Sequence, residues 1–367
     1  MSSLPLSTLA QGNAEIVVGQ SVPTTGPLAT LAGPLIIGTQ VYFDQVNASG
    51  GVNGSKIKLV TMDDNFQPDR THENVKKLIS ADKAIAILNT CGAPNSDGLI
   101  TKNILSAAGV PLIGPYTASV LVRSRKSPLA YFVASGAGEE ADAVVKQIKS
   151  MGLTKLGVMY QNDLFGQDGL AEVTRATKAE GIQLVGTGKF ERNAEDIEPA
   201  IDELGKSAPQ AIVMFGPGAT TAKFVAGYRK KYGVRSMLIS SSAGSVDAIV
   251  AATGQQNAAG IGLIQVVPNP ANPTVRIAGE YRSALAKFGP KGAQISSYGM
   301  QGFITAKVLV EGLKRGGGRD AASLVQGLNS IRAWEMGGIT MDFSGGNRQG
   351  SRFADIGIIG SSGRLLN

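Results

Sequence analysis

The chain alternates short apolar runs with longer segments in which apolar residues recur every three or four positions. Residues 16–22 form a β-branched run that predicts a strand, and residues 35–46 have the spacing of a helix. The alternation continues, with strands expected at 57–63, 84–89 and 111–114 and helices at 70–81 and 97–108. Strands that alternate with helices in this way form a parallel sheet covered on both faces.

A second series of the same kind begins after Ser135. Helices are expected at 139–151, 167–180, 197–206 and 221–232, and strands at 155–160, 182–189, 211–215 and 237–240. Because this series has its own strands and helices, we expect it to form its own lobe. From Gly260 the pattern loosens into a strand at 261–267, helices at 274–288, 297–312 and 321–328, and short strands at 338–341 and 355–359.

Length and composition agree with an α/β protein of two Rossmann-like lobes, each a parallel sheet flanked by helices. A chain of 367 residues exceeds the size at which one core usually keeps growing. No apolar run approaches the roughly 20 residues that cross a bilayer. Residues 1–13 lack the basic start and apolar stretch of an intact secretion signal, so they are interpreted as an extension left after signal removal or added in its place.

The net charge, and two residue types that occur only once in the sequence, exclude several classes of function. The net charge is +7, but Lys and Arg are scattered, so we expect no nucleic-acid partner. The single histidine, His72, and the single cysteine, Cys91, supply neither a metal site nor a catalytic pair. Residues 136–141 resemble a dinucleotide-binding turn, yet two glutamates would face the diphosphate. A nucleotide-dependent α/β enzyme therefore remains the less favoured alternative, and we expect no catalysis, metal or cofactor.

The loops that follow the expected strands carry the candidate chemistry. In parallel sheets a ligand lies beyond the carboxyl ends of the strands. Hydroxyl groups, amides and glycines gather in the loops at 24–27, 89–93, 115–119, 161–166, 216–219 and 240–243. Each loop alone is explained by helix capping and turns. Their recurrence instead predicts a small-molecule site, in which glycine permits close approach and helix N–H groups bind a carboxylate.

Six ordered motifs carry a resemblance to a known family. They are Pro-Thr-Thr-Gly-Pro at 23–27, Val-Asn-Ala-Ser-Gly-Gly-Val-Asn-Gly at 46–54, Asp-Asp-Asn-Phe-Gln-Pro at 63–68, Ala-Gly-Val-Pro-Leu-Ile at 108–113, Tyr-Gln-Asn-Asp-Leu-Phe-Gly at 160–166 and Ser-Tyr-Gly-Met-Gln-Gly at 297–302. From about Glu15 onward the chain resembles the branched-chain amino-acid binding proteins, ABC-transporter receptors with the type I periplasmic binding fold.

The resemblance implies how the protein works and where its lobes divide. Three hinge crossings, near 131–135, 262–267 and 336–340, join the lobes. Lobe 1 is expected to comprise residues 14–133 and 266–338, and lobe 2 residues 134–265 and 339–367. A ligand in the cleft favours the closed state. The implied partner is the membrane permease of an ABC transporter, the implied location is the periplasm or a lipid-anchored position on the outer face, and we expect a monomer.

The resemblance also suggests ligand-binding residues. In members that bind aliphatic amino acids, loops after the third and fourth strands hold the carboxylate and ammonium, and an aromatic residue of the second lobe closes over the ligand. One further residue comes from the loop after the first expected strand. The full set of expected ligand-binding residues is Thr25, Cys91, Gly92, Ala93, Tyr116, Thr117, Ala118, Phe165, Gly218, Ala219, Ser241 and Ser242.

Two departures from the family pattern leave the ligand open. The acidic residue that often binds the ligand ammonium has no counterpart at 240–243, and the hydroxyl expected after Cys91 is replaced by Gly92. A branched-chain or aliphatic amino acid, or a related small carboxylate, is the expected ligand. The alternatives are an aromatic or keto acid without an amine, because a buried ammonium needs a partner, and a role as a ligand-sensing domain.

Overall fold

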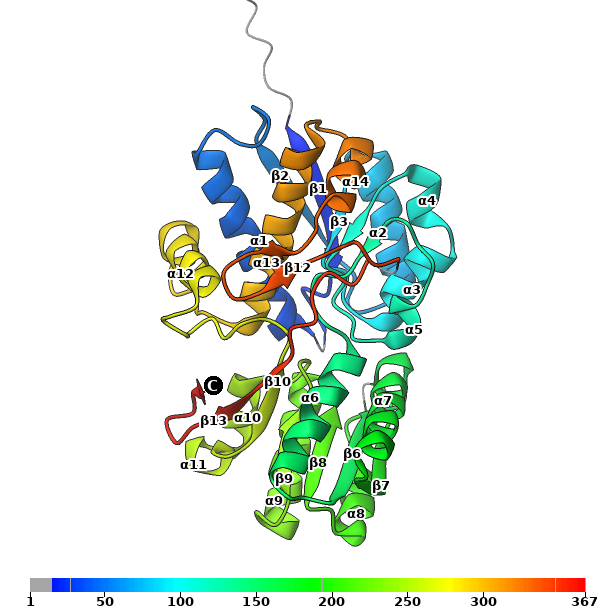
Figure 1. The fold of residues 1–367 in the computed structure, drawn as a ribbon, viewed down its shortest axis with the longest axis vertical. Helices are drawn as coiled ribbons and strands as arrows, with labels where there is room; N and C mark the ends of the chain where they lie inside the picture. Colours follow the sequence, from blue (N-terminus) through cyan, green and yellow to red (C-terminus); the bar gives the residue numbers. More distant parts are fainter. Residues whose placement is uncertain (1–14, 27, 193, 347, 367) are drawn as a thin grey trace, which may run out of the picture.

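The computed structural model describes residues 15–366 apart from residues 27, 193 and 347. The expected extension at 1–13 lies outside the described residues. Two sheets, each flanked by helices, form two lobes that are stacked along the long axis of the molecule (Figure 1). The predicted fold class, α/β with two lobes, is confirmed.

The first lobe is built on a five-stranded sheet whose strands are all parallel. Its strand order is β2 (Ile57–Asp63), β1 (Ile16–Val22), β3 (Ile87–Leu88), β4 (Leu112–Ile113) and β5 (Ala130–Tyr131). Its helices are α1 (Ala29–Ala48), α2 (Pro68–Ser80), α3 (Ala93–Thr101), α4 (Ile104–Ala108), α5 (Val120–Arg123), α12 (Arg276–Phe288), α13 (Ser297–Gly316) and α14 (Ala321–Asn329). A small antiparallel pair, β11 (Trp334–Glu335) and β12 (Thr340–Met341), completes the lobe.

Helices α1 and α13 approach each other closely because glycines meet at their crossing. A Cβ atom added to Gly38 on α1 would lie 1.8 Å from the carbonyl oxygen of Gly299 on α13. No side chain fits in that space, so the two backbones pack directly on one face of the sheet. This contact fixes a late segment of the chain, α13, against the first helix.

The second lobe contains a seven-stranded sheet. Its order is β14 (Leu365–Leu366), β13 (Asp355–Ile359), β10 (Gly262–Gln265), β9 (Met237–Ser240), β8 (Ala211–Phe215), β6 (Lys155–Gln161) and β7 (Gln183–Phe190). Its helices are α6 (Ala137–Ser150), α7 (Leu164–Glu180), α8 (Glu198–Ser207), α9 (Gly218–Tyr232), α10 (Val246–Thr253) and α11 (Gln255–Ala258). The sheet is not purely parallel, since β13 is antiparallel to β10. The reason is that β10 runs toward the first lobe, whereas β13 returns from it.

The chain passes between the lobes after β5, after β10 and before β13. The third passage differs from the expected one. Ile339, Met341 and Phe343 are buried in the core of the first lobe, and the ring of Phe343 packs edge-on against Tyr131 with 5.2 Å between centroids. Residues 339–343 therefore pack with lobe 1 rather than lobe 2, because their apolar side chains complete its core. The boundaries expected at 133 and 265 stay predictions.

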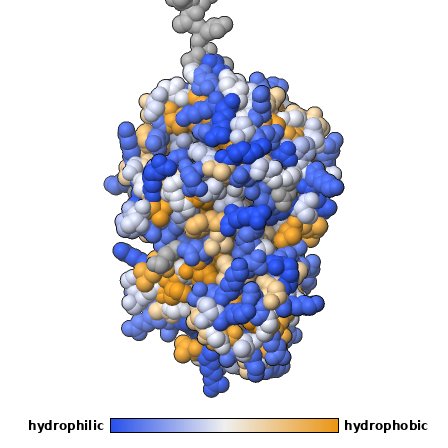
Figure 2. Space-filling view, in the orientation of Figure 1, coloured by the Kyte–Doolittle hydropathy of each residue, from blue (hydrophilic) through white to orange (hydrophobic). Residues whose placement is uncertain are grey.

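The face of the molecule seen in Figure 2 is mostly polar. Figure 2 shows hydrophilic residues spread over both lobes, with apolar residues in separate patches. Within the described ranges, no helix combines the length and apolar character that crossing a membrane requires.

Candidate ligand-binding site

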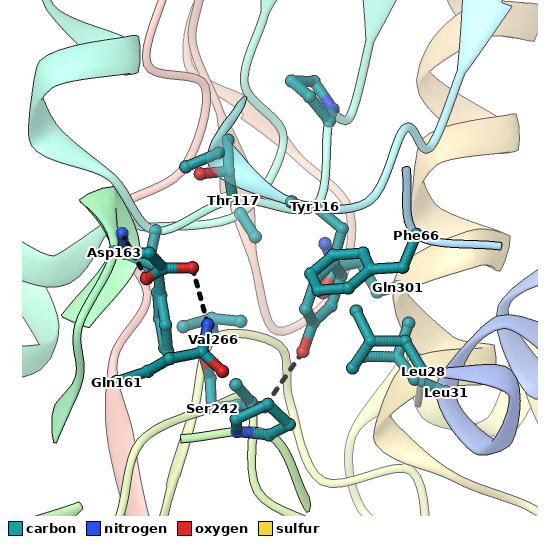
Figure 3. Close-up of a pocket in the computed structure, with 18 of the residues that line it drawn as sticks. Leu28, Leu31, Phe66, Tyr116, Thr117, Gln161, Asp163, Ser242, Val266 and Gln301 are labelled. Carbon is teal, nitrogen blue, oxygen red and sulfur yellow. Dashed lines mark hydrogen bonds between the residues drawn. The ribbon is translucent and has the colours of Figure 1, made fainter. Parts of the chain in front are cut away.

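A cavity lies between the lobes, where loops after the strands of both sheets meet. It contains about 670 Å³ of empty space, its mouth included. In Figure 3, Phe66, Leu28 and Leu31 of the first lobe lie on one side, and Gln161 and Asp163 of the second lobe lie on the other. The site is therefore shared between lobes, as a clamp requires.

Seven of the twelve expected residues line this cavity. They are Gly92, Ala93, Tyr116, Thr117, Ala118, Phe165 and Ser242. They come from the loops after β3, β4, β6 and β9, which the topology brings to one place. Their contacts with a ligand stay predictions.

The other five expected residues are not among the lining residues. The hydroxyl of Thr25 donates to Asp63 at 2.7 Å, and its backbone N–H donates to the same carboxylate at 3.1 Å. Thr25 therefore fastens the loop after β1 to the end of β2. Cys91 is fully buried, donates its thiol hydrogen to the carbonyl of Asn89, and packs in an apolar cluster. Burial raises the pKa of the Cys91 thiol well above its usual value, so it is a packing residue.

The remaining three belong to the second lobe and are also absent from the cavity lining. Ser241 is fully buried, and its backbone N–H donates to the carbonyl of Met214. A Cβ atom on Gly218 would lie 2.8 Å from the side chain of Ser245. Pro217, rather than Gly218 or Ala219, reaches the cavity from the start of α9.

The start of α3 is shaped for close approach by a ligand. Its N-cap, Gly92, has a φ of 101°, which favours glycine. A Cβ atom there would lie 2.7 Å from the ring of Phe66 and 2.8 Å from Oδ1 of Asn95. No side chain caps the first turn of α3. The positive end of the helix dipole therefore faces the cavity without a capping carboxylate or hydroxyl.

Helix α9 begins at the same cavity from the opposite lobe, and its N-cap, Pro217, also gives no side-chain cap. In contrast, α7 is capped by Asp163, which accepts hydrogen bonds from the backbone N–H groups of Phe165 and Gly166 at 3.1 and 3.2 Å. Neither α3 nor α9 has a side-chain cap at its start, so the positive end of each helix dipole lies at the cavity without a compensating side chain.

Apolar side chains form much of the remaining wall. Leu28, Leu31 and Phe66 come from the first lobe, and Phe165 and Val266 face them from the second lobe and the second passage. Of these, only Phe165 was expected from the sequence. Burying a ligand's hydrocarbon against this wall contributes roughly 25 cal/mol for each Å² removed from water.

Arg123 is a buried cation in the cavity wall that the sequence analysis did not single out. Its side chain is 4% exposed. Its five N–H groups donate to acceptors around the first passage: twice to the carbonyl of Thr117 and once each to the carbonyls of Ala134 and Ser135 and to Oε1 of Gln349. Burial lowers the pKa of Arg123 to about 10, so the side chain remains charged near neutral pH.

Glu140 is a buried acidic side chain whose charge interacts with that of Arg123. It is fully buried and accepts hydrogen bonds from Ser242, at 3.0 Å from the backbone N–H and 2.7 Å from the hydroxyl. Burial raises the pKa of Glu140, and the Ser242 bonds and the charge of Arg123 partly offset that rise. The two charges of opposite sign therefore compensate each other inside the protein.

The turn at residues 136–141 packs against the side chain of Arg123. A Cβ atom on Gly136 would lie 2.8 Å from Cδ of Arg123, and the backbone N–H of Gly136 donates to Glu139 at 3.1 Å. The Arg123 side chain thus lies against the glycine that a dinucleotide would have to approach. Among the described residues, no group of three or more His, Cys, Asp or Glu residues could hold a metal ion.

Direct bonds connect the lobes at the cavity. The hydroxyl of Tyr116 donates to the carbonyl of Ser242 at 3.0 Å (Figure 3). Tyr298 on α13 donates to the carbonyl of Gly244. Both tyrosines belong to the first lobe and both acceptors to the second, so these bonds hold the lobes together in this conformation.

Comparisons with known proteins agree with this arrangement. A family model described as periplasmic binding protein matches residues 15–363. A solved substrate-binding periplasmic protein from Ralstonia solanacearum is 30% identical, with a TM-score of 0.90 over 96% of this chain and 99% of that one. An amino acid binding protein from Pseudomonas aeruginosa is 25% identical over 90% of this chain and 86% of its own length.

A Leu/Ile/Val-binding protein homolog from Brucella suis is 23% identical over 98% of this chain and 93% of its own length. The expected kinship with the branched-chain amino-acid binding proteins is thereby confirmed. The chain belongs to the periplasmic binding protein family.

Proposed function

We propose that the protein is the substrate-binding component of an ABC importer in the periplasm, and that it binds a branched-chain or aliphatic amino acid or a related small carboxylate. The observation that carries the proposal is the meeting of two helix starts without side-chain caps, α3 from one lobe and α9 from the other, at one apolar-walled cavity. This arrangement suits a ligand with one anionic group and a hydrocarbon body.

Within this proposal the carboxylate binds at the start of α3, between the backbone of Gly92 and Ala93 and the loop that contains Thr117. Backbone N–H groups and the helix dipole favour the charge there. The ring of Phe165 covers the apolar part from the second lobe. Contacts to both lobes stabilise the closed state, which the permease would then recognise.

A thermal-shift panel of amino acids and small organic acids tests the proposal. A compound that binds only the folded state at 100 times its Kd stabilises that state by about 2.7 kcal/mol. We expect one class of compounds to raise the Tm by several degrees. Phe165→Ala should remove most of that shift.

Phe288→Ala is the matched control, because this phenylalanine packs on the outer helix α12 of the first lobe. It should lower the Tm without ligand but keep the ligand-induced shift. If no compound in the panel raises the Tm, or if Phe165→Ala retains the full shift, the proposed site is wrong.

A further inference from the structure

Several main-chain carbonyls around the cavity are already bonded to donors of the protein. Both N–H groups on one edge of the Arg123 guanidinium donate to the carbonyl of Thr117, at 3.0 and 2.9 Å. The carbonyls of Ala134 and Ser135 each accept a further bond from Arg123 at 2.9 Å. An α-ammonium group has three N–H donors, and inside a closed cavity each needs an acceptor. On the first-lobe side of the cavity, these carbonyls accept their hydrogen bonds from Arg123 rather than from a ligand.

Carbonyls of the loop after β9, in the second lobe, also accept hydrogen bonds from the protein. The carbonyl of Ser242 accepts from the Tyr116 hydroxyl at 3.0 Å, and that of Ala243 lies 3.4 Å from the Tyr298 hydroxyl as its second acceptor. Glu140, directly behind this loop, accepts both the N–H and the hydroxyl of Ser242. The carboxylate of Glu140 therefore binds the loop rather than a ligand.

Asp163 is the one carboxylate among the described residues that line the cavity. One of its oxygens accepts from the first turn of α7, at Phe165 and Gly166. The other accepts from Nε2 of Gln161 and lies 3.6 Å from the guanidinium of Arg192. The negative charge of Asp163 is thus balanced by Arg192 and by the start of α7 in the absence of a ligand.

The charges around the cavity therefore balance without an amine. All five N–H groups of Arg123 are bonded to protein acceptors, and Arg192 is matched by Asp163. What remains is the positive partial charge at the starts of α3 and α9. A ligand with one negative charge complements that remainder, whereas an ammonium group would lose its water and meet the Arg123 cation in the wall.

We propose that the ligand is a monocarboxylate with an apolar body and no ammonium group, because Asp163, the one carboxylate among the described lining residues, is already matched by Arg192 and Gln161, and the carbonyls named above are already bonded to donors of the protein. This inference rests on the proposed function and narrows its ligand class. A 2-oxo acid and a simple aliphatic or aromatic acid share the required chemistry.

Two series of compounds, each with one carbon skeleton, test the inference by calorimetry on the full chain. The first is leucine, 4-methyl-2-oxopentanoate and 4-methylpentanoate; the second is phenylalanine, phenylpyruvate and 3-phenylpropanoate. Within a series only the substituent beside the carboxylate changes. We expect at least one amine-free acid to bind at least tenfold more tightly than its amino-acid partner.

Two variants of Ala243 test whether the lack of an unmatched carboxylate explains the preference for a ligand without an amine. Ala243 lines the cavity on the loop that lacks an acidic residue. Ala243→Asp supplies an unmatched carboxylate, and Ala243→Asn supplies the same shape without the charge. Compared with Ala243→Asn, Ala243→Asp should weaken binding of the amine-free acid and strengthen that of the amino acid, so that their affinity ratio falls by at least tenfold.

The outcomes separate this inference from the proposed function. If an amino acid binds as tightly as its amine-free partners, the inference is overturned while the carboxylate site stands. An affinity ratio equal in the two Ala243 variants would also contradict it. If no member of either series binds at millimolar concentration, the proposed carboxylate site fails, and the inference fails with it.

Discussion

The guanidinium carbon of Arg192 lies 3.6 Å from the centroid of the Phe66 ring, across the boundary between the lobes. The same guanidinium donates to the carbonyl oxygen of Phe66 at 2.9 Å. Because it also lies 3.6 Å from Asp163, Arg192 joins the lobes beside the cavity and balances its carboxylate.

Arg192→Gln should weaken ligand binding about tenfold, because a cation–π contact and a charge-assisted hydrogen bond of the closed state together contribute roughly 1–2 kcal/mol. Calorimetry measures the affinity, and solution scattering should show a larger radius of gyration without ligand. Arg175→Gln, which removes an exposed cation of α7, is the control. Unchanged affinity in Arg192→Gln would show that this contact does not influence closure.

Arg123→Met should lower the free energy of unfolding by about 3–5 kcal/mol, since it leaves the buried carbonyls of Thr117, Ala134 and Ser135 without their donors. Urea denaturation measures the loss. Arg315→Met removes a partly exposed Arg paired with Glu311 and should cost less than about 1 kcal/mol. Equal losses in the two variants would contradict the structural role assigned to Arg123.

Asp63 should contribute to the acid sensitivity of the fold. Burial acts to raise the pKa of its carboxyl, but hydrogen bonds from the Thr25 hydroxyl and from the N–H groups of Asn65 and Thr25 outweigh burial and lower the pKa to about 2, from an ordinary value of 3.8. A depressed pKa stabilises the fold above the unfolded value, and that contribution is lost as the pH falls from about 4 to 2.

Asp63→Asn should therefore lose less stability than the parent protein between pH 4 and pH 2 in denaturant titrations. Thr25→Ala, which removes the hydroxyl bond to Asp63, should change the acid response in the same direction. Because Thr25 does not line the cavity, its replacement should leave ligand affinity unchanged. A large loss of affinity in Thr25→Ala would restore the ligand role first expected for it.

Gly38→Ala should destabilise the protein by about 1–3 kcal/mol, because the new methyl group would push α1 away from the backbone of Gly299. Gly279→Ala on α12 is the matched control. The nearest atom to its added Cβ is Nη2 of Arg282 at 3.8 Å, so alanine should stabilise this helix by about 0.5–1 kcal/mol. Urea midpoints that move in the same direction for both variants would contradict this packing argument.

Alternating apolar patterns predicted most of the strands and helices in their order, but not α5, α10, α11 or β14, and not the ends of several elements. The expected helix at 97–108 is interrupted, with α3 ending at Thr101 and α4 beginning at Ile104. Asn103, between them, has a φ of 59°, a left-handed conformation that breaks the helix. The expected strand at 84–89 is paired as a strand only over Ile87–Leu88, because ladder pairing depends on neighbours that the sequence does not reveal.

The cavity loops were predictable because ligands of parallel sheets lie at strand ends, but the direction of each side chain was not. Cys91 bridges Tyr116 in an extended segment, so Cys91 and Gly92 face opposite sides and only Gly92 lines the cavity. Ser241 and Ser242 differ in the same way. Arg123 was missed because only the folded chain brings its short helix against the first passage.

The late position of α13 in the chain has a consequence for folding. The sheet that begins with β1 is complete at Tyr131, yet the helix that packs against α1 starts only at Ser297. A chain that emerges in order, whether during synthesis or during export, leaves one face of this sheet uncovered until α13 follows. A chaperone that shields apolar surface during that interval should raise the yield of native protein.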